Sequence, residues 1–348
     1  MQKYTELLTP KNTDGEIIMG IETSCDETAV SIVKGGREVL SDVIISSATE
    51  HAVFGGVVPE IASRAHTLAI GVAVDKALKE AGLKLSDIDA FAVTEGAGLL
   101  GALLVGVSYA KALAFSEKKP LIPVSHIRGH MAAAYLADKN LRPPFVALLT
   151  SGGHTAIIEV KDYYTIEHIG STLDDAVGES FDKVARVLGL KYPGGPNVER
   201  LAKEGKPTIK FPKMLKGKGG YNFSYSGLKT AVINYIHNAE QKGVSVKKED
   251  VACSFQHSAL DILAEKAVLA TLEKGHDTLV LCGGVAANGY LREIVKTLAD
   301  KKGIKTVLPE KRYCTDNGSM IAAEGYLQYK KGNFADLTLN AKANVPLC

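Results

Sequence analysis

Residues 277–300, DTLVLCGGVAANGYLREIVKTLAD, repeat the pattern of residues 87–114, DIDAFAVTEGAGLLGALLVGVSYAKALA. Each stretch reads as an apolar strand, a glycine-rich turn and a helix. The elements expected around both stretches follow one order, so each half of the 348-residue chain reads βββαβαβα. A duplicated α/β unit predicts two lobes with a ligand-binding cleft between them.

The remaining strands and helices are predicted from the spacing of apolar residues and from the positions of glycine and proline. Three strands open each half, at residues 16–24, 28–36 and 38–47 and at residues 144–153, 154–162 and 164–172. A helix over Pro59–Ala81 begins at a proline and ends before Gly82, short strands cover 120–125 and 304–309, and a last helix starts near Asn317. We expect a first lobe of residues 17–124 plus 320–348, a second lobe of 125–319, and a polar N-terminal leader of 1–16.

The composition points to an ordinary intracellular protein. Apolar residues make up 46% and charged residues 23%, and the net charge of +2 excludes bulk attraction to nucleic acid, so any such contact needs a local patch. The apolar run Gly96–Ala110 is shorter than the roughly 20 residues that span a bilayer, so a buried helix is expected. The polar start does not resemble a signal peptide, and we expect a cytoplasmic protein without membrane contact. The scattered cysteines form no CxxC pair and favour a reducing compartment: Cys25, Cys253, Cys282, Cys314 and Cys348.

Three polar or glycine-rich turns follow strand ends, ETSCDET at 22–28, TSGGHT at 150–155 and CGGVAAN at 282–288. Backbone N–H groups in such turns can cradle phosphate. One such turn is weak evidence, but three at matching positions resemble the layout of sugar kinases, actin and chaperone ATPases. Asp182 or Glu199 can accept hydrogen bonds from a ribose, or both can be solvated helix-face charges, like the neighbouring acids Asp174, Asp175 and Glu179.

His126 and His130, in HIRGH, lie four residues apart near an expected helix start. Side chains at i and i+4 share a helix face and can chelate one divalent ion. The alternative is two histidines that are satisfied by hydrogen bonds. Metallopeptidases of the HExxH type place glutamate where this chain has Ile127, which argues against that chemistry. Asp316 is a candidate third ligand from the opposite lobe.

Two further features remain open. His51 and His66 lack chelate spacing and are interpreted as loop and helix polar residues near the cleft. A lysine-rich segment, Lys203–Lys218, precedes three aromatic residues, Tyr221, Phe223 and Tyr225. Such a segment can bind RNA phosphates and stack bases, or it can be a mobile solvated loop.

Eight motifs together resemble one family: GIETSCDETAVSIV, FGGVVPEIASRAH, HIRGHMAAA, TSGGHT, DDAVGESFDKVARVLGLKYPGGP, FSYSGLKTA, GGVAANGYLR and CTDNGSMIA. They are similar to the universal tRNA threonylcarbamoyladenosine transferase family, in its bacterial branch, over residues 17–325. The resemblance implies the duplicated actin/Hsp70/sugar-kinase-like α/β fold, with a nucleotide cleft between two lobes. It also implies transfer of a threonylcarbamoyl group from threonylcarbamoyl-adenylate to N6 of adenosine 37, in tRNAs that read codons starting with A, with release of AMP.

The resemblance also assigns residues and partners. His126, His130 and Asp316 fall on the family's metal ligands, for one iron or zinc ion. Asp26 and Glu27 fall on positions linked to activity. Adenylate-binding positions are Leu149, Thr150, Ser151, Gly152, Gly153, Asp182, Gly195, Glu199 and Asn288. The implied partners are tRNA, an inactive paralogue that forms a heterodimer, and a small P-loop ATPase, since this chain has no Walker A sequence.

Three other classes make different demands on the sequence. A metallopeptidase needs the missing glutamate. A sugar kinase or chaperone-type ATPase uses magnesium and phosphoryl transfer, which have no use for a two-histidine chelate. A non-catalytic scaffold of the same family is expected to lose the histidine pair, which this chain keeps.

Overall fold

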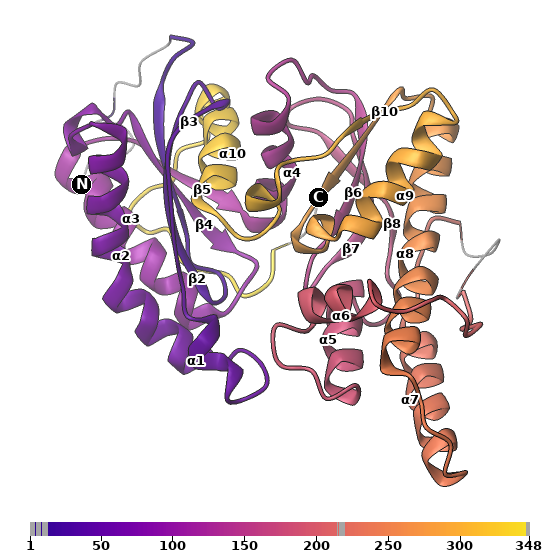
Figure 1. Ribbon diagram of the computed structural model, residues 1–348. Helices are drawn as coiled ribbons and strands as arrows, with labels where there is room; N and C mark the ends of the chain where they lie inside the picture. The colour runs from indigo at the N-terminus through magenta and orange to yellow at the C-terminus, as the bar shows by residue number, and fades with distance from the viewer. Residues whose placement is uncertain (1–3, 5–7, 9–12, 214, 216–219, 346–348) are drawn as a thin grey trace. The chain divides into compact units, whose positions relative to one another are not determined.

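The computed structural model describes Tyr4, Leu8, residues 13–213, Leu215 and residues 220–345 (Figure 1). The chain divides into two compact units, the first made of the described residues up to Leu141 and from Thr315 onward, and the second of Arg142–Cys314. Most of the expected leader, residues 1–3, 5–7 and 9–12, lies outside the described residues. Tyr4 is described and buried, and its hydroxyl donates to the carbonyl of Ala114 at 2.6 Å.

The first unit contains a five-stranded mixed sheet in the order β3-β2-β1-β4-β5. Its strands are β1 (Ile17–Glu22), β2 (Glu27–Lys34), β3 (Glu38–Ser46), β4 (Ala90–Gly96) and β5 (Leu121–Ser125). β1 pairs antiparallel with β2 and parallel with β4. Side chains alternate between the faces of a strand, and both faces of β1 are buried. Met19 and Ile21 belong to the core that includes helix residues of α2 and α3, whereas Gly20 lies against α10.

The first unit has five helices among the residues that the structure describes. They are α1 (Ala48–Ala52), α2 (Pro59–Ala81), α3 (Leu100–Glu117), α4 (His126–Ala137) and α10 (Gly318–Lys331). Helix α2 begins at the expected proline and ends at Gly82, which adopts a left-handed φ of 66°. Helix α10 approaches β1 so closely that a Cβ on Gly20 would lie 2.2 Å from the carbonyl oxygen of Gly318.

The second unit repeats the sheet. Its order is β10-β9-β6-β7-β8, built from β6 (Phe145–Thr150), β7 (Thr155–Val160), β8 (Ile166–Ser171), β9 (Thr278–Cys282) and β10 (Lys305–Val307). In both units the first strand of the half pairs antiparallel with the second and parallel with the fourth, which confirms the duplication read from the sequence. The helices are α5 (Val177–Val187), α6 (Gly194–Ala202), α7 (Ser226–Gln241), α8 (Lys248–Glu273) and α9 (Gly289–Asp300).

The division between the units differs from the expected one. The units separate at Leu141/Arg142 and Cys314/Thr315, not at 124/125 and 319/320. The physical reason is that α4 packs along α10, and α10 packs on β1 and β2 of the first sheet. Asp316 was expected to come from the opposite lobe, although the expected boundaries placed it with both histidines in the second lobe. In the structure all three residues belong to the first unit.

Helix α3 carries the apolar run noted in the sequence. Within the described residues it is the one helix long and apolar enough to cross a membrane by length and composition. One face, including Leu103 and Val107, is buried against α2 and β4, as in the core helix of a globular unit. The expectation of a buried helix holds for that face only, because Leu100, Leu104 and Phe115 are exposed.

Candidate metal centre and anion-binding turns

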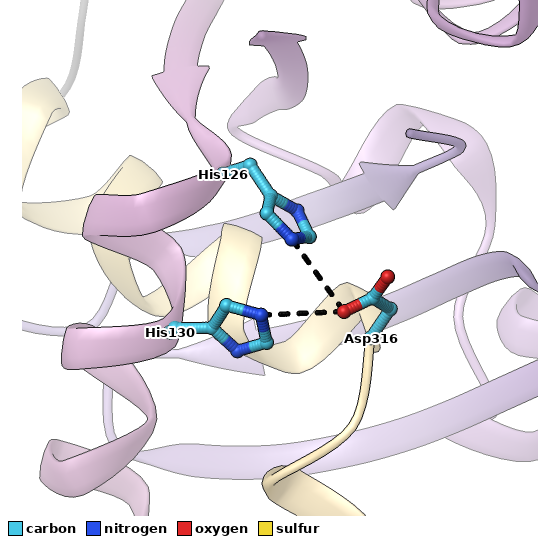
Figure 2. A group of neighbouring side chains, drawn as sticks. All are labelled: His126, His130 and Asp316. Carbon is cyan, nitrogen blue, oxygen red and sulfur yellow. Dashed lines mark ion pairs between the residues drawn. The ribbon is translucent and has the colours of Figure 1, made fainter. Parts of the chain in front are cut away.

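Two histidines and one aspartate of the first unit converge on one point (Figure 2). Strand β5 ends at Ser125 and α4 begins at His126, so His126 and His130 lie one turn apart on the same helix face. Asp316 directly precedes Asn317, whose side chain caps α10 by accepting from the Met320 amide at 2.8 Å. Asp316 Oδ1 lies 3.5 Å from His126 Nε2 and 3.3 Å from His130 Nε2. The three residues that the sequence proposed as ligands are thus brought together.

Burial makes the charges of this cluster interact strongly. His130 is 1% exposed and His126 is 9% exposed. Burial alone would lower the pKa of His126, but the Asp316 and Glu22 carboxylates raise it to about 9. Burial opposes the ionised form of Asp316 as well, yet the two imidazoles lower its pKa to about 2. An ionised carboxylate therefore faces both rings, which favours a cation at this point.

Glu22, the last residue of β1, lies behind His126 and is fully buried. Its Oε2 lies 2.9 Å from His126 Nδ1 and accepts from Thr94 Oγ1 at 2.7 Å, while Oε1 accepts from the Ser24 amide at 2.5 Å. Burial would raise the pKa of Glu22, and the facing His126 lowers it, so the carboxylate is ionised. A carboxylate in this place holds a proton on Nδ1, so Nε2 is the nitrogen that can bind a metal ion once the ion displaces the second proton of the ring.

Sequence reasoning did not single out Glu22 as a partner of the histidines. The available signal was a glutamate that ends an otherwise apolar strand, IIMGIE. The second histidine is held differently, because His130 Nδ1 is buried without a hydrogen-bond partner among the described residues.

The donor set fits a divalent transition metal. Two imidazole nitrogens and one carboxylate oxygen, all within 4.8 Å of one another, match three-ligand zinc sites with an open position. The same set matches the two-histidine, one-carboxylate sites of iron(II). The chemistry of these donors does not choose between the two ions.

Asp26 is the last residue of the turn between β1 and β2, and Glu27 is the first residue of β2. The Asp26 carbonyl accepts from the Ser47 amide at 2.9 Å, and Glu27 Oε1 accepts from Ser46 Oγ at 3.1 Å. Burial raises the pKa of Glu27 to about 9, and the negative charges of Asp316 and Asp26 add to this effect. Glu27 therefore carries a proton at neutral pH when no cation is present nearby.

His66 lies on helix α2 as expected, whereas His51 lies in helix α1 and not in a loop. Both side chains are fully buried and have structural contacts, so neither is exposed to a cleft. His66 Nδ1 lies 2.7 Å from Thr28 Oγ1, and its Nε2 lies 2.9 Å from the Cys25 carbonyl oxygen. His51 Nδ1 accepts from the Val58 amide at 3.2 Å. His66 thus supports the 22–28 turn from helix α2.

The turn after β6 in the second unit is open and neutral. Ser151 donates its amide to the His154 carbonyl at 2.8 Å, and the His154 amide donates to Ser151 Oγ at 3.1 Å. A Cβ built on Gly152 or Gly153 would meet no atom within 4 Å. The turn therefore leaves room for an anion against its backbone N–H groups.

The other expected adenylate-binding positions also belong to the second unit. Asp182 Oδ1 accepts from the Gly194 amide at 2.8 Å and also bonds the Gly195 amide, while burial raises the pKa of Asp182. Glu199 Oε1 accepts from the Gly289 amide at 3.0 Å. Neither acid is simply a solvated helix-face charge. Leu149 and Thr150 end β6 beside β9, and Asn288 caps α9 by accepting from Leu291 at 3.0 Å.

The neighbouring acids have structural contacts. Asp174 accepts from the Tyr225 amide at 2.7 Å at the start of α7. Asp175 pairs with Lys183 at 2.9 Å and with Lys229 at 2.8 Å, and Glu179 pairs with Lys183 at 2.6 Å. These contacts tie the segment before α5 to α7.

The lysine-rich segment is partly fixed in place. Lys213 contacts Asp261 at 2.8 Å, and Phe211 is buried, so a mobile solvated loop does not describe that part. Residues 214 and 216–219, with Lys216 and Lys218, lie outside the described residues. The prediction that bases stack on Phe223 or Tyr225 is wrong, because both side chains are only 1% exposed. Tyr221 is half-buried and donates to Glu273.

Comparison with known proteins gives concordant results. Residues 38–323 match the model of the TsaD family, tRNA N6-adenosine threonylcarbamoyltransferase. The chain is 50% identical over 331 residues to the tRNA N6-adenosine threonylcarbamoyltransferase of Staphylococcus aureus strain MRSA252, covering 95% of this chain and 97% of that protein. The protein of that name from strain Newman is 49% identical over the same coverage.

Solved structures with low sequence identity share the fold. HypF of T. kodakarensis superposes with a TM-score of 0.62 at 17% identity, over 93% of this chain and 49% of HypF. Component A of the Acidaminococcus fermentans (R)-2-hydroxyglutaryl-CoA dehydratase gives 0.52 at 15% identity, over 91% and 99%. With the repeated sheet, these similarities confirm the expected duplicated α/β fold of the actin/Hsp70/sugar-kinase type.

Proposed function

The chain belongs to the tRNA N6-adenosine threonylcarbamoyltransferase family and transfers a threonylcarbamoyl group to N6 of adenosine in tRNA, and we propose that His126, His130 and Asp316 hold the metal ion for this reaction. The donor is L-threonylcarbamoyl-adenylate. The acceptor is adenosine 37 of tRNAs that read codons starting with A, and the products are the modified nucleoside, t6A, and AMP.

The observation that carries the proposal is the convergence of both imidazoles on Asp316 Oδ1, at 3.5 and 3.3 Å. One iron or zinc ion, when bound, supplies a Lewis acid that stabilises negative charge developing on donor oxygens. The protein supplies the orientation of the ligands. Glu22 fixes His126 from behind, and the cap at Asn317 fixes the backbone that carries Asp316.

We assign the adenylate to the second unit. The Gly152 and Gly153 amides of the Ser151-Gly152-Gly153 turn donate to the phosphate that leaves with AMP, because fixed N–H groups stabilise negative charge without reorganisation. Asp182 and Glu199 accept from ribose hydroxyls. Their carboxylates already lie at helix N-terminal amides, which holds their positions before the ligand arrives. Leu149, Thr150, Gly195 and Asn288 complete the binding surface.

We assign to Asp26 and Glu27 the role of accepting the proton that the attacking amine loses. The exocyclic amine of adenosine is a weak nucleophile and must lose a proton as the new carbon–nitrogen bond forms. Asp26 ends the turn whose Ser24 hydroxyl is 3.2 Å from His126 Nδ1, and Glu27 follows it as the first residue of β2. A nearby cation would favour the ionised form of Glu27, which is the form that can accept the proton.

We also propose the setting of the reaction. The chain acts in the cytoplasm on tRNA, without membrane contact. It works with an inactive paralogue as heterodimer partner and with a separate small P-loop ATPase, because the chain has no Walker A sequence of its own.

One experiment tests the function directly. Chemically prepared threonylcarbamoyl-adenylate is mixed with unmodified tRNA, the partner proteins and the metal-loaded chain, and the nucleosides are analysed by mass spectrometry. The wild type and the exposed-histidine control His237→Ala are expected to form the modified adenosine, and His126→Ala is not. Equal product from His126→Ala and wild type would contradict the metal proposal. Phosphoryl transfer from ATP, or peptide cleavage, without the modified nucleoside would contradict the function.

A further inference from the structure

The charge of the chain is unevenly distributed. Residues 177–247, from the start of α5 to the residue before α8, contain thirteen lysines and arginines and five aspartates and glutamates. This segment therefore has a net charge of +8, and the rest of the chain, with +2 overall, has −6. Basic residues gathered in one part of a near-neutral protein are typical of a surface that binds a polyanion.

Hydrogen bonds and ion pairs connect the exposed cations of this segment into one surface. Asn197 donates to the Lys191 carbonyl at 2.9 Å and accepts from Arg200 at 2.9 Å, which places Arg200 beside Lys191. Lys203 follows Arg200 by three residues, one helical turn further along α6 and into its C-cap. This part of the surface therefore runs along α6.

The surface continues to the start of α8. Asp250 Oδ1 accepts from the Lys206 amide at 2.8 Å and lies 3.3 Å from Lys247 Nζ, so these two lysines are neighbours. Lys248 donates to the Leu188 carbonyl at 2.9 Å, which brings the start of α8 to the end of α5, two residues after Arg186. Helices α5, α6 and α8 pack together in the second unit (Figure 1). We call this surface the basic face, and its exposed members are Arg186, Lys191, Arg200, Lys203, Lys206 and Lys247.

The acidic groups on the same surface are partly neutralised. Glu199 accepts from the Gly289 amide and lies 3.3 Å from Lys203 Nζ, and Asp250 is held by Lys206 and Lys247. Glu204 is exposed and Glu249 is half-buried. Asp182 interacts with Arg186 from the preceding turn of α5. Six exposed cations among five carboxylates, counting Asp182, still leave an excess of positive charge.

The basic face borders the residues to which we assigned the donor. Glu199 lies on α6 between Lys191 and Arg200 in sequence and contacts Lys203. Asp182 lies one helical turn before Arg186 on α5. An adenosine within an RNA chain reaches the donor together with its neighbouring phosphates, and these would pass the basic face. RNA carries one negative charge per nucleotide, so the two charges are complementary.

From this charge distribution and this position, we infer that the basic face is the surface on which the second unit binds the phosphate backbone of the acceptor tRNA. The inference rests on the proposed function, because that function makes an RNA the acceptor. Contacts of this kind are independent of base sequence and position the RNA rather than select it.

The test measures binding of an unmodified tRNA transcript to the full-length chain by fluorescence anisotropy at several salt concentrations. The variant R200Q/K206Q/K247Q is compared with the control K296Q/K301Q/K302Q, which removes three charges at the end of α9 in the same unit. Each lost phosphate contact lowers the salt slope by about 0.7–0.9, so the basic-face variant is expected to lose about 2–3 in slope and about 10–100-fold in affinity. The control is expected to stay within about twofold of the wild type. AMP affinity and melting temperature, expected to be unchanged, exclude misfolding.

The outcomes separate the surface from the function. Wild-type affinity and salt slope in the basic-face variant would overturn the surface, as would a variant that loses its paralogue partner but binds tRNA normally. With the partners and donor present, the variant is expected to show a raised KM for tRNA and a nearly unchanged kcat. A wild type that binds tRNA through this face but forms no modified adenosine would overturn the proposed function and leave the surface in place.

Discussion

The turn after β1 and the turn after β6 occupy the same position in two sheets of the same strand order, yet they are built for opposite charges. The first, residues 22–28, is buried and acidic, and Glu22 contacts His126. The second, residues 150–155, has two glycines whose α-carbons face open space. Carboxylates and imidazoles favour a cation, and bare backbone amides favour an anion. Topology placed both turns at strand ends, and side chains decided their chemistry.

The largest expected effect comes from removing a ligand of the proposed metal site, which lies beside the acidic turn. His130→Ala or Asp316→Ala removes one of three ligands, and the lost charge stabilisation is expected to lower the transfer rate by about 1,000-fold. Metal content, measured by plasma mass spectrometry, is expected to fall in parallel, while His237→Ala retains both. Full metal content with full activity in either variant would show that the cluster is not the metal site.

A smaller effect is expected from Glu22→Gln, which keeps the size of the side chain and removes its charge. Because the amide no longer holds His126 Nδ1 as firmly, affinity for zinc is expected to fall about 10–100-fold. Competition with a chromophoric chelator measures this affinity. The exposed Glu38→Gln serves as control, and equal affinities in the two variants would argue against an orienting role for Glu22.

The turn of residues 150–155 can be displaced by a substitution at a residue that we do not assign to ligand binding. A Cβ on Gly178 would lie 2.6 Å from the Ser151 carbonyl oxygen, so Gly178→Ala is expected to displace the turn, weaken AMP binding about 10-fold and destabilise the unit by about 1–3 kcal/mol. Calorimetry with AMP and thermal melting measure both. Gly152→Ala, whose Cβ meets no atom within 4 Å, is expected to leave the melting temperature unchanged. Similar melting temperatures for the two variants would refute the steric argument.

The smallest effect concerns stability of the metal-free protein. The pKa of Glu27 is raised to about 9, above the ordinary value of 4.5 that it regains on unfolding. Glu27 therefore destabilises the fold increasingly as the pH rises from 4.5 towards 9, because only the unfolded state releases the proton freely. Glu27→Gln is expected to raise the melting temperature by a few degrees at pH 7, and by less at pH 5. A melting temperature lowered at pH 7 would contradict this assignment.

Most of the candidate site residues were predicted from local sequence patterns and from the family resemblance. The i, i+4 spacing of His126 and His130 aligns the two side chains wherever the segment is helical. The segment is helical in the structure because β5 ends one residue before His126, where α4 begins. Glu22 was missed because its role depends on a partner 104 residues away in sequence. Phe223 and Tyr225 were misread because an aromatic residue beside lysines can face RNA or the core, and burial decides between them.

By itself, the sequence determined the duplicated strand order, the helix that aligns the two imidazoles and the family to which the chain belongs. Each of these depends on the spacing of apolar residues, on the positions of glycine and proline, or on contiguous motifs. Tertiary structure alone decided that α4 packs along α10, that the histidines and Asp316 belong to the first unit, and that Glu22 lies behind His126. The physical reason is that these contacts join residues far apart in the chain, and side-chain packing and burial select them.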